Sequence, residues 1–302
     1  MRAGRGRPRG RLTSGAGTAD DRRGGSGQAP LRRVTSHKNV ALQHVRRLQQ
    51  KRARREERLL VAEGEDVVQA ALDRGVQPVL LLVDDERVAP DDPRLIATEG
   101  LAERYAVPER LLGTVSTLAQ PPRIIGVFPQ PGPYHFRTVA MPPDIGVYLA
   151  GVADPGNVGT LVRTAAALGA DWLALGPGSA DSAHPRAVRA AMGATFALPV
   201  LEGVRAADLA TREGFRIAAA VAHGGAPPWE VDLTVPTVLA LGAERSGLGP
   251  VIEEMRGTME VVEITIPQGD GAESLNVAAA GAALLAERLR QRSVAGEAPA
   301  VH

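Results

Sequence analysis

The chain has 302 residues, enough for two domains of ordinary size, and its 44% hydrophobic but only 3% aromatic content predicts cores filled by aliphatic side chains. Cysteine is absent, which excludes disulfides, thiolate metal sites and cysteine nucleophiles. The net charge of +1 hides an asymmetry, because residues 1–60 carry 17 Arg and Lys against 4 Asp and Glu, whereas the remainder carries 18 against 30. This asymmetry predicts a polyanionic partner for the N-terminal part, and a solvated tail is the alternative.

No apolar run approaches the roughly 18 residues that a membrane-spanning helix needs, and the N-terminal stretch lacks the apolar segment of a signal peptide. We therefore expect a cytoplasmic protein with neither a membrane partner nor a metal.

The N-terminal part begins with a low-complexity tail. Residues 1–30 are mostly Arg, Gly, Ser and Pro, which is typical of a disordered basic tail. A helical pattern runs from residue 36 to about 55, and the Arg-rich helix expected over residues 44–58 has enough basic charge to follow a phosphate backbone. The side chains expected to make these contacts are Arg46, Arg47, Lys51, Arg52, Arg54 and Arg55.

A small α/β unit follows this helix. The apolar runs and Gly positions predict strands at 59–64, 78–83 and 124–128 and helices at 65–74 and near 95–105. Residues 129–143 carry five prolines, which predicts a stiff linker. We thus expect a binding domain over 31–128, a second domain over 144–290 and a disordered tail over 291–302.

The second domain alternates apolar strands with helices. Strands are expected at 145–152, 171–175, 215–221, 236–241 and 260–266, and helices at 157–168, 184–193, 204–213, 248–256 and 274–290. This alternation predicts an α/β fold with a mostly parallel sheet covered on both faces.

The first of three polar motifs spans residues 154–165 and opens a helix after a strand. Asn157 is placed to cap that helix, and Gly159 permits another backbone to approach closely. Arg163 lies on a different helix face, and its small neighbours suggest close packing around it.

The second motif, residues 238–249, is a buried strand followed by a Gly-flanked turn that carries Glu244; a surface carboxylate is the alternative interpretation. It lacks the signatures of a Walker A loop and of a dinucleotide-binding loop, which disfavours both nucleotide classes. In the third motif a strand stops at Pro267, a polar loop follows, and Ser274 begins a long helix. Taken alone, Ser274 is best explained as a helix cap.

Together the three motifs resemble the SpoU/TrmH family of RNA ribose 2′-O-methyltransferases, within the knotted SPOUT class. The first family motif is matched by Pro155, Asn157, Gly159 and Arg163, and the second by Gly242, Glu244 and Gly247. The third is matched by Ile266, Pro267, Glu273, Ser274, Leu275, Asn276 and Val277. A stretch around Arg186 and Arg189 is also similar, with Ala191 where the family often has Ser. Residues 36–128 are similar, more loosely, to the family's ribosomal-protein-like RNA-binding domain.

The resemblance implies a deep trefoil knot in the second domain, S-adenosylmethionine as cofactor and a homodimer with its site at the subunit interface. The cofactor would contact Leu241, Gly242, Gly247, Ile264, Ile266 and Leu275.

The resemblance also places Arg163 beside the target hydroxyl. Because a guanidinium is effectively always protonated, we expect Arg163 to clamp the target phosphate and the developing alkoxide rather than act as a base. Asn157, Ser274 and Asn276 would orient the ribose, Glu244 would anchor Arg163 or Asn157, and Arg186 and Arg189 would add contacts to RNA.

Several alternatives stay open at this point. The substrate is expected to be 23S rRNA, with a role in antibiotic resistance suggested by the GC-rich composition, and tRNA is the alternative. A non-catalytic RNA-binding factor for ribosome assembly on the same scaffold is the rival from another class.

Overall fold

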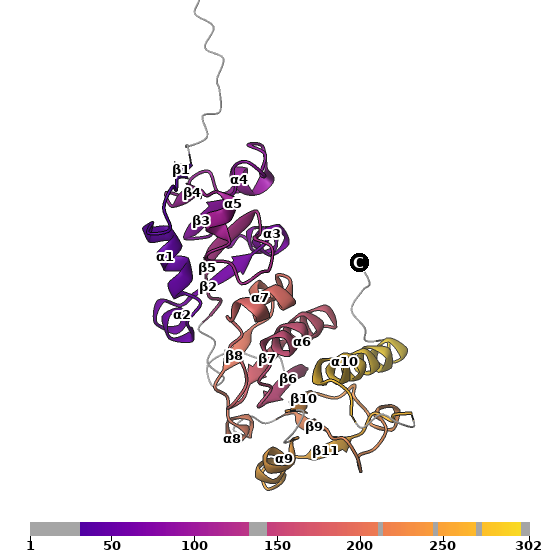
Figure 1. The fold of residues 1–302 in the computed structure, drawn as a ribbon. Helices are drawn as coiled ribbons and strands as arrows, with labels where there is room; N and C mark the ends of the chain where they lie inside the picture. Colours follow the sequence, from indigo (N-terminus) through magenta and orange to yellow (C-terminus); the bar gives the residue numbers. More distant parts are fainter. Residues whose placement is uncertain (1–30, 133–143, 211–213, 244–246, 270–273, 297–302) are drawn as a thin grey trace, which may run out of the picture.

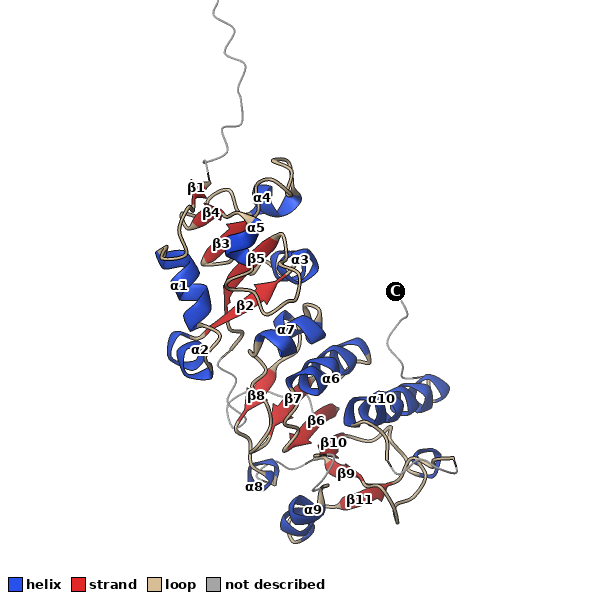
Figure 2. Cartoon of the chain, in the orientation of Figure 1, coloured by secondary structure: helices blue, strands red, loops and turns tan. Residues whose placement is uncertain are grey.

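The computed structural model describes residues 31–132, 144–210, 214–243, 247–269 and 274–296, which form two sheets with helices around each (Figures 1 and 2). The expected tail 1–30 and most of the expected linker 129–143 lie outside these residues, and Pro129 is the last residue of a strand. No helix within the described ranges is both long and apolar enough to cross a bilayer.

The first sheet has five strands in the order β1-β4-β3-β5-β2. Strand β5 pairs antiparallel with β2 and β3, while β4 pairs parallel with β1 and β3. The strands are β1 (Arg32–Arg33), β2 (Leu59–Glu63), β3 (Leu80–Val83), β4 (Arg104–Ala106) and β5 (Ile124–Pro129). The helices are α1 (Val40–Arg47), α2 (Lys51–Glu57), α3 (Glu65–Leu72), α4 (Pro93–Ala97) and α5 (Glu109–Leu112).

Two helix predictions in this part were wrong. The single basic helix expected over 36–55 and 44–58 is instead α1 and α2, because Gln50 is extended (ψ 131°) and starts a new helix in a new direction. The helix expected near 95–105 ends at Ala97, and residues 104–106 pair with β3 as a buried strand. Burial between β3 and β1 outweighs local helix propensity there.

The second sheet has six strands in the order β11-β9-β10-β6-β7-β8, and every pair is parallel. The strands are β6 (Ile145–Ala150), β7 (Trp172–Leu175), β8 (Val200–Glu202), β9 (Arg216–Ala220), β10 (Thr237–Gly242) and β11 (Val261–Ile264). The helices are α6 (Pro155–Ala167), α7 (Pro185–Ala191), α8 (Ala206–Leu209), α9 (Gly249–Arg256) and α10 (Val277–Val294), with 3-10 turns η1 (Ala194–Phe196) and η2 (Pro228–Glu230). The predicted α/β fold with a mostly parallel sheet is thereby confirmed.

Both faces of this sheet are covered, as expected for parallel strands. Helices α6 and α10 pack over one face and α8 and α9 over the other (Figure 1), and each face has its own aliphatic cluster. Gly281 lets α10 come close, since a Cβ there would lie 2.5 Å from a methyl of Leu161 on α6.

The ends of several elements differ from their predicted positions. The last helix begins at Val277 and continues to Val294, so residues 291–294 are helical rather than part of the predicted tail 291–302. The helix predicted at 204–213 is described only as the short α8, and residues 211–213 lie outside the described ranges. Strand β8 was not predicted, because three residues carry too little periodicity to be distinguished from a loop.

The two sheets are joined by an apolar contact that centres on α7 and η1. Ala183 and Val188 are buried among side chains of the first sheet and α3. Phe128 and Phe196 meet edge to face with centroids 5.4 Å apart. Gly193 (φ 84°) lies so close to α3 that a Cβ there would be 2.2 Å from the Cβ of Ala70. The two parts therefore share one continuous hydrophobic cluster.

A buried ion pair crosses the same boundary. Arg54 of α2 is 1% exposed and binds Asp181 through Nη2 (2.6 Å) and Nε (3.1 Å). Its Nη1 donates to the carbonyls of Leu48 and Gln49, which are exposed by the break between α1 and α2. The guanidinium of Arg54 thus stabilises the turn between α1 and α2 and also attaches α2 to the second domain.

Candidate active site

The site lies where the strands of the parallel sheet end. Strands β7 and β8 follow β6 on one side, whereas β10, β9 and β11 lie on the other, so the strand order reverses between β6 and β10. Ligands of open parallel sheets bind in the crevice beyond the carboxyl ends of the strands at such a reversal. All three predicted motifs follow strand ends at this edge, or begin the helix that packs beside it.

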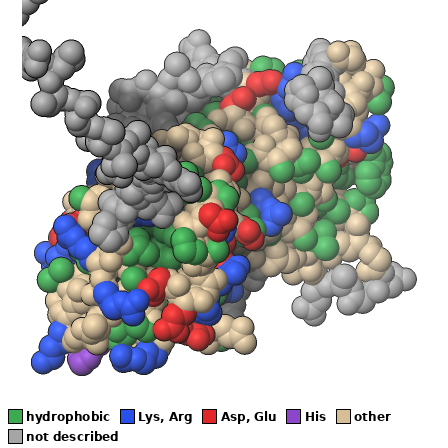
Figure 3. Space-filling model, turned by 90° about the horizontal axis from the view of Figure 1, so that it is seen from above, with side chains coloured by type: hydrophobic (Ala, Val, Ile, Leu, Met, Phe, Trp, Pro, Cys, Tyr) green, Lys and Arg blue, Asp and Glu red, His purple; other side chains and the backbone are tan. Residues whose placement is uncertain are grey.

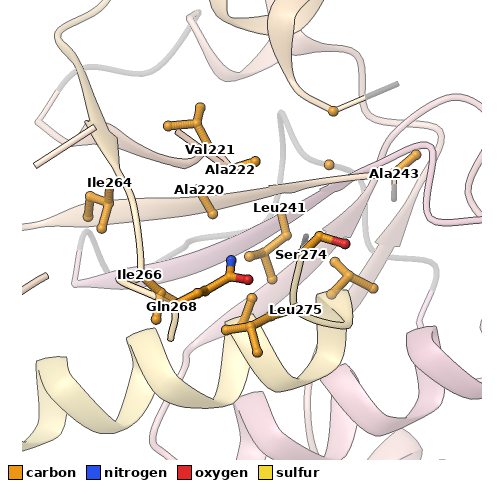
Figure 4. A pocket seen from close by; sticks show the side chains of 14 residues that line it. Ala220, Val221, Ala222, Leu241, Ala243, Ile264, Ile266, Gln268, Ser274 and Leu275 are labelled. Atoms are coloured by element: carbon orange, nitrogen blue, oxygen red, sulfur yellow. The ribbon is translucent and has the colours of Figure 1, made fainter. Parts of the chain in front are cut away.

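An open pocket of about 670 Å³, including its mouth, occupies this edge (Figure 4). Its walls are mainly apolar and come from the segments after β9, β10 and β11 and from the start of α10. Gly242 allows the backbone of Gly247 to pack closely against it, because a Cβ at Gly242 would lie 2.6 Å from that backbone. The lining residues are Ala220, Val221, Ala222, Leu241, Gly242, Ala243, Gly247, Ile264, Ile266, Gln268, Ser274, Leu275, Val277 and Ala280.

A second pocket adjoins the first and shares Ala243 and Val277 with it. It is lined by residues 151–154 after β6 and by Asn157 of α6. Two pockets therefore meet at one edge, and the second carries the polar side chains of Asp154 and Asn157, which suits a reaction between two different ligands.

Two asparagines join the helices that border these pockets. Asn276 Nδ2 donates to Asn157 Oδ1 at 3.2 Å, although the residues are 119 positions apart in sequence. Asn276 Oδ1 accepts from the backbone N–H groups of Ala278 and Ala279, so Asn276 caps α10. The cap predicted at Ser274 is therefore wrong, and Ser274 is an exposed residue in the pocket wall.

The cap of α6 was also wrongly predicted. Asp154 Oδ1 accepts from the N–H of Asn157 at 2.9 Å, so Asp154 caps the helix and the side chain of Asn157 projects from its first turn. The other oxygen of Asp154 pairs with Arg186 of α7 at 3.0 Å. A polar chain thus runs from α7 through the α6 cap to the α10 cap.

The predicted cofactor residues are brought together. Leu241, Gly242, Gly247, Ile264, Ile266 and Leu275 all line the apolar pocket. Arg163 is different: in the single chain it is exposed, lines neither pocket and has no hydrogen bond or ion pair to a described residue, so the close packing around it stays a prediction. Glu244 lies outside the described residues.

Most of the chain is similar to known RNA methyltransferases. Residues 144–286 match the SpoU rRNA Methylase family, and residues 39–126 match an MRM3-like substrate binding domain. The 23S rRNA (guanosine(2553)-2'-O)-methyltransferase RlmP of Bacillus subtilis is 29% identical, over 84% of this chain and 98% of that protein. The 23S rRNA (uridine(2479)-2'-O)-methyltransferase of Streptomyces viridochromogenes is 29% identical, over 86% of this chain and 93% of that protein.

A solved structure agrees with these sequence matches. The AdoMet-bound rRNA methyltransferase from Sinorhizobium meliloti is 30% identical, covers 87% of this chain and 98% of that chain, and aligns with a TM-score of 0.74. This chain belongs to the SpoU rRNA methylase family. The predicted resemblance and the predicted class, an S-adenosylmethionine-dependent RNA methyltransferase, are confirmed. The trefoil knot stays a prediction.

The pocket of this SpoU methylase fits S-adenosylmethionine by its chemistry. Its walls are mainly aliphatic, which suits an adenine ring. One polar atom in the pocket is unused, because Oε1 of Gln268 is buried and accepts no hydrogen bond from any described residue. A purine ligand that donates a hydrogen bond would satisfy it.

The basic residues predicted to bind RNA are divided by the structure. Arg54 is buried in its ion pair with Asp181, so its assignment to RNA contact was wrong. The remaining five on α1 and α2, namely Arg46, Arg47, Lys51, Arg52 and Arg55, are exposed. Several of them are already paired with carboxylates, and Figure 3 shows Lys and Arg interspersed with Asp and Glu on the face it displays. This surface is therefore one of mixed charge.

Two pKa shifts near the site have physical causes. Burial lowers the pKa of His184, and the neighbouring charge of Arg54 adds to the effect; its ring caps α7 by accepting from the N–H of Arg186. Burial raises the pKa of Tyr148, whose hydroxyl points toward the carbonyl of Val204, to about 12. Tyr148 is therefore a neutral phenol at physiological pH. No group of three His, Asp or Glu side chains in the described ranges is arranged to hold a metal.

Sequence reasoning missed two residues of the site, Asp154 and Gln268. Asp154 stands directly before the Pro at the first turn of α6, a signal typical of a helix N-cap that was available in the sequence. Gln268 follows the Ile-Pro pair in an irregular loop, where nothing in the periodicity indicates which way a side chain points.

Proposed function

We propose that this chain methylates a ribose 2′-OH of 23S rRNA, with S-adenosylmethionine as methyl donor. The observation that carries the proposal is the bond between Asn157 and Asn276, which joins the first and third motifs beside two adjoining pockets. Two of the chain's relatives, from Bacillus subtilis and Streptomyces viridochromogenes, are named as methyltransferases of 23S rRNA. One is named for a guanosine and the other for a uridine, so the base is left open.

The apolar pocket is the place for the cofactor, held by Leu241, Gly242 and Gly247 on one side and by Ile264, Ile266 and Leu275 on the other. Bound there, S-adenosylmethionine supplies an electrophilic methyl group on a sulfonium. The absence of a side chain at Gly242 lets the backbone of Gly247 pack against it in the wall of the pocket.

The second pocket, which Asp154 and Asn157 border, takes the target ribose. The bond from Asn276 holds the amide of Asn157 in the wall of this pocket, where it helps to position the ribose. Ser274 borders the apolar pocket and orients the ribose where the two pockets meet. Holding two reactants in line removes about 7–11 kcal/mol of barrier in favourable cases, so positioning is the main contribution of these side chains.

Arg163 neutralises the target phosphate and the alkoxide that develops on the 2′ oxygen, and Glu244 anchors Arg163 or Asn157. A guanidinium donates two parallel hydrogen bonds to a phosphate, which a lysine cannot reproduce. Since Arg163 is exposed and lines neither pocket of the single chain, we propose a homodimer in which the second copy completes the site around it. Light scattering on the purified protein tests the dimer directly.

RNA is recruited through the exposed basic residues of α1 and α2, with Arg186 and Arg189 of α7 between that surface and the site. Arg189 already reaches across the domain boundary to Thr117 (3.4 Å). A role in resistance to a ribosome-targeting antibiotic is the further extension of this proposal.

The deciding experiment transfers labelled methyl groups from S-adenosylmethionine onto unmodified 23S rRNA, 16S rRNA and tRNA, and then maps the product. Label confined to one ribose of 23S rRNA supports the proposal, and label confined to tRNA refutes the choice of RNA. The variant Arg163→Lys should lose most of kcat while binding S-adenosylhomocysteine as the wild type does. Retention of full kcat would contradict the role of the guanidinium. Binding of cofactor without any transfer would support the non-catalytic alternative.

A further inference from the structure

Gln268 is the one polar side chain of the apolar pocket that comes from the segment directly after β11, and its chemistry is unexplained by the fold. Its Oε1 is buried without a hydrogen-bond donor among the described residues. An unsatisfied buried acceptor costs about 1–3 kcal/mol, so native proteins rarely keep one without a reason. The neighbouring lining residues on this side are Ile264 and Ile266, which offer no partner.

The orientation of the pocket places this amide far from the reacting end of the cofactor. The second pocket, proposed above for the target ribose, touches the apolar one at Ala243 and Val277, so the sulfonium belongs at that end. Figure 4 shows Ala243 on one side of the pocket and Gln268 with Ile266 on the other, with the amide of Gln268 directed toward Leu241 and Leu275. The purine of the cofactor therefore occupies the opposite end of the apolar pocket, which Gln268 borders.

We propose that the side-chain amide of Gln268 reads the adenine of S-adenosylmethionine, by accepting from its exocyclic amino group and donating to the adjacent ring nitrogen. A glutamine amide matches the donor and acceptor pattern of an adenine edge, and this pairing is worth about 1–3 kcal/mol of discrimination. The terminal torsion of a glutamine is soft, so the buried oxygen turns to face the ligand at little cost. This inference rests on the proposed function, because it assigns a contact within the proposed cofactor site.

The test is calorimetric and uses the full chain with two ligands. S-adenosylhomocysteine carries the amino group, and its purine-riboside analogue has a hydrogen in that place. We expect the wild type to bind S-adenosylhomocysteine about 10-fold more tightly than the analogue. The variant Gln268→Leu should bind S-adenosylhomocysteine about 10-fold more weakly than the wild type and should no longer distinguish the two ligands.

Two further measurements separate this role from a structural one. Gln268→Leu removes an unsatisfied buried group, so its unliganded thermal midpoint should not fall below that of the wild type. At saturating RNA its KM for S-adenosylmethionine should rise while kcat stays unchanged, as when uniform binding is removed. The matched control is Gln43→Leu, which alters an exposed glutamine on α1 and should leave both affinities as they are.

The outcomes are distinguishable from failure of the proposed function. If the wild type binds neither ligand, the cofactor assignment itself is wrong. If it binds both ligands equally, or if Gln268→Leu keeps the wild-type preference for the amino group, only the role of Gln268 is overturned.

Discussion

Replacing Arg54 with Met should destabilise the whole protein, although Arg54 looks like one of several interchangeable basic residues in the sequence. The guanidinium is 1% exposed and uses three nitrogens in four hydrogen bonds, two of them to Asp181. Met preserves most of the apolar stem but leaves the Asp181 carboxylate, itself 7% exposed, facing an apolar neighbour.

The magnitude follows from that arrangement. Removing one partner of a buried ion pair costs about 3–5 kcal/mol, chiefly because the other charge stays buried and unpaired. Because the two parts of the chain share an aliphatic cluster, we expect one cooperative unfolding transition. At about 2–4 °C per kcal/mol for a protein of this size, the thermal midpoint should fall by about 10 °C.

The assay is urea unfolding of the full chain, followed by circular dichroism. The control is Arg55→Met, since the neighbouring Arg55 is 59% exposed and approaches Glu202 only to 3.5 Å; a surface pair of this kind contributes about 0–1 kcal/mol. The double variant Arg54→Met with Asp181→Leu should recover much of the loss, because no charge is left unpaired. A change below about 1 kcal/mol for Arg54→Met would refute the reasoning, and Arg54 would again be a candidate for RNA contact.

Three other perturbations test separate features. Asn276→Ala should lower the unfolding free energy by about 1 kcal/mol through loss of the α10 cap and should reduce kcat by removing the hydrogen bond to Asn157 Oδ1, whereas Ser274→Ala should leave stability unchanged. Gly193→Ala should destabilise more than Gly203→Ala, because both have positive φ but only Gly193 has Ala70 in the way; urea midpoints check both pairs. The pKa of His184 is lower in the folded state than its ordinary value of about 6.5. Below about pH 6.5 the unfolded state therefore binds more protons than the folded state. The free energy of unfolding consequently decreases as the pH falls through the folded pKa of His184. His184→Asn, which keeps a capping side chain, should flatten this pH dependence between pH 8 and 5.

The fold of the second domain was largely predictable because its strands are long, apolar and separated by helices. Tyr148 and Leu149 of β6 sit in a continuous buried run, which reads as a strand covered on both faces. The first domain was harder. Residues 104–106 carry an Arg and a Tyr, and only their pairing with β3 makes them a strand, a contact that local pattern does not contain.

Several residues that line the apolar pocket were predictable from the motifs, whereas the helix caps were not. Motif spacing brought Gly242, Ile264 and Leu275 to one pocket, but the same spacing assigned the caps to Asn157 and Ser274. A cap depends on where the backbone leaves the extended region, and this position shifts by two or three residues without any change in composition. Arg54 was misjudged for a related reason, since burial of a charge is decided by the partner across the domain boundary.

The side chain of Asn276 both caps α10 and binds Asn157, and the first contact fixes the geometry of the second. Its Oδ1 is fixed by two backbone N–H groups of α10, so its Nδ2 can only point outward, and Asn157 Oδ1 lies there. That bond in turn decides which way the Asn157 amide faces. Aspartate would cap α10 equally well but would present an acceptor to an acceptor, and serine would cap without reaching Asn157. Asparagine is therefore the residue among the common caps that starts the helix and sets the orientation of its partner at once.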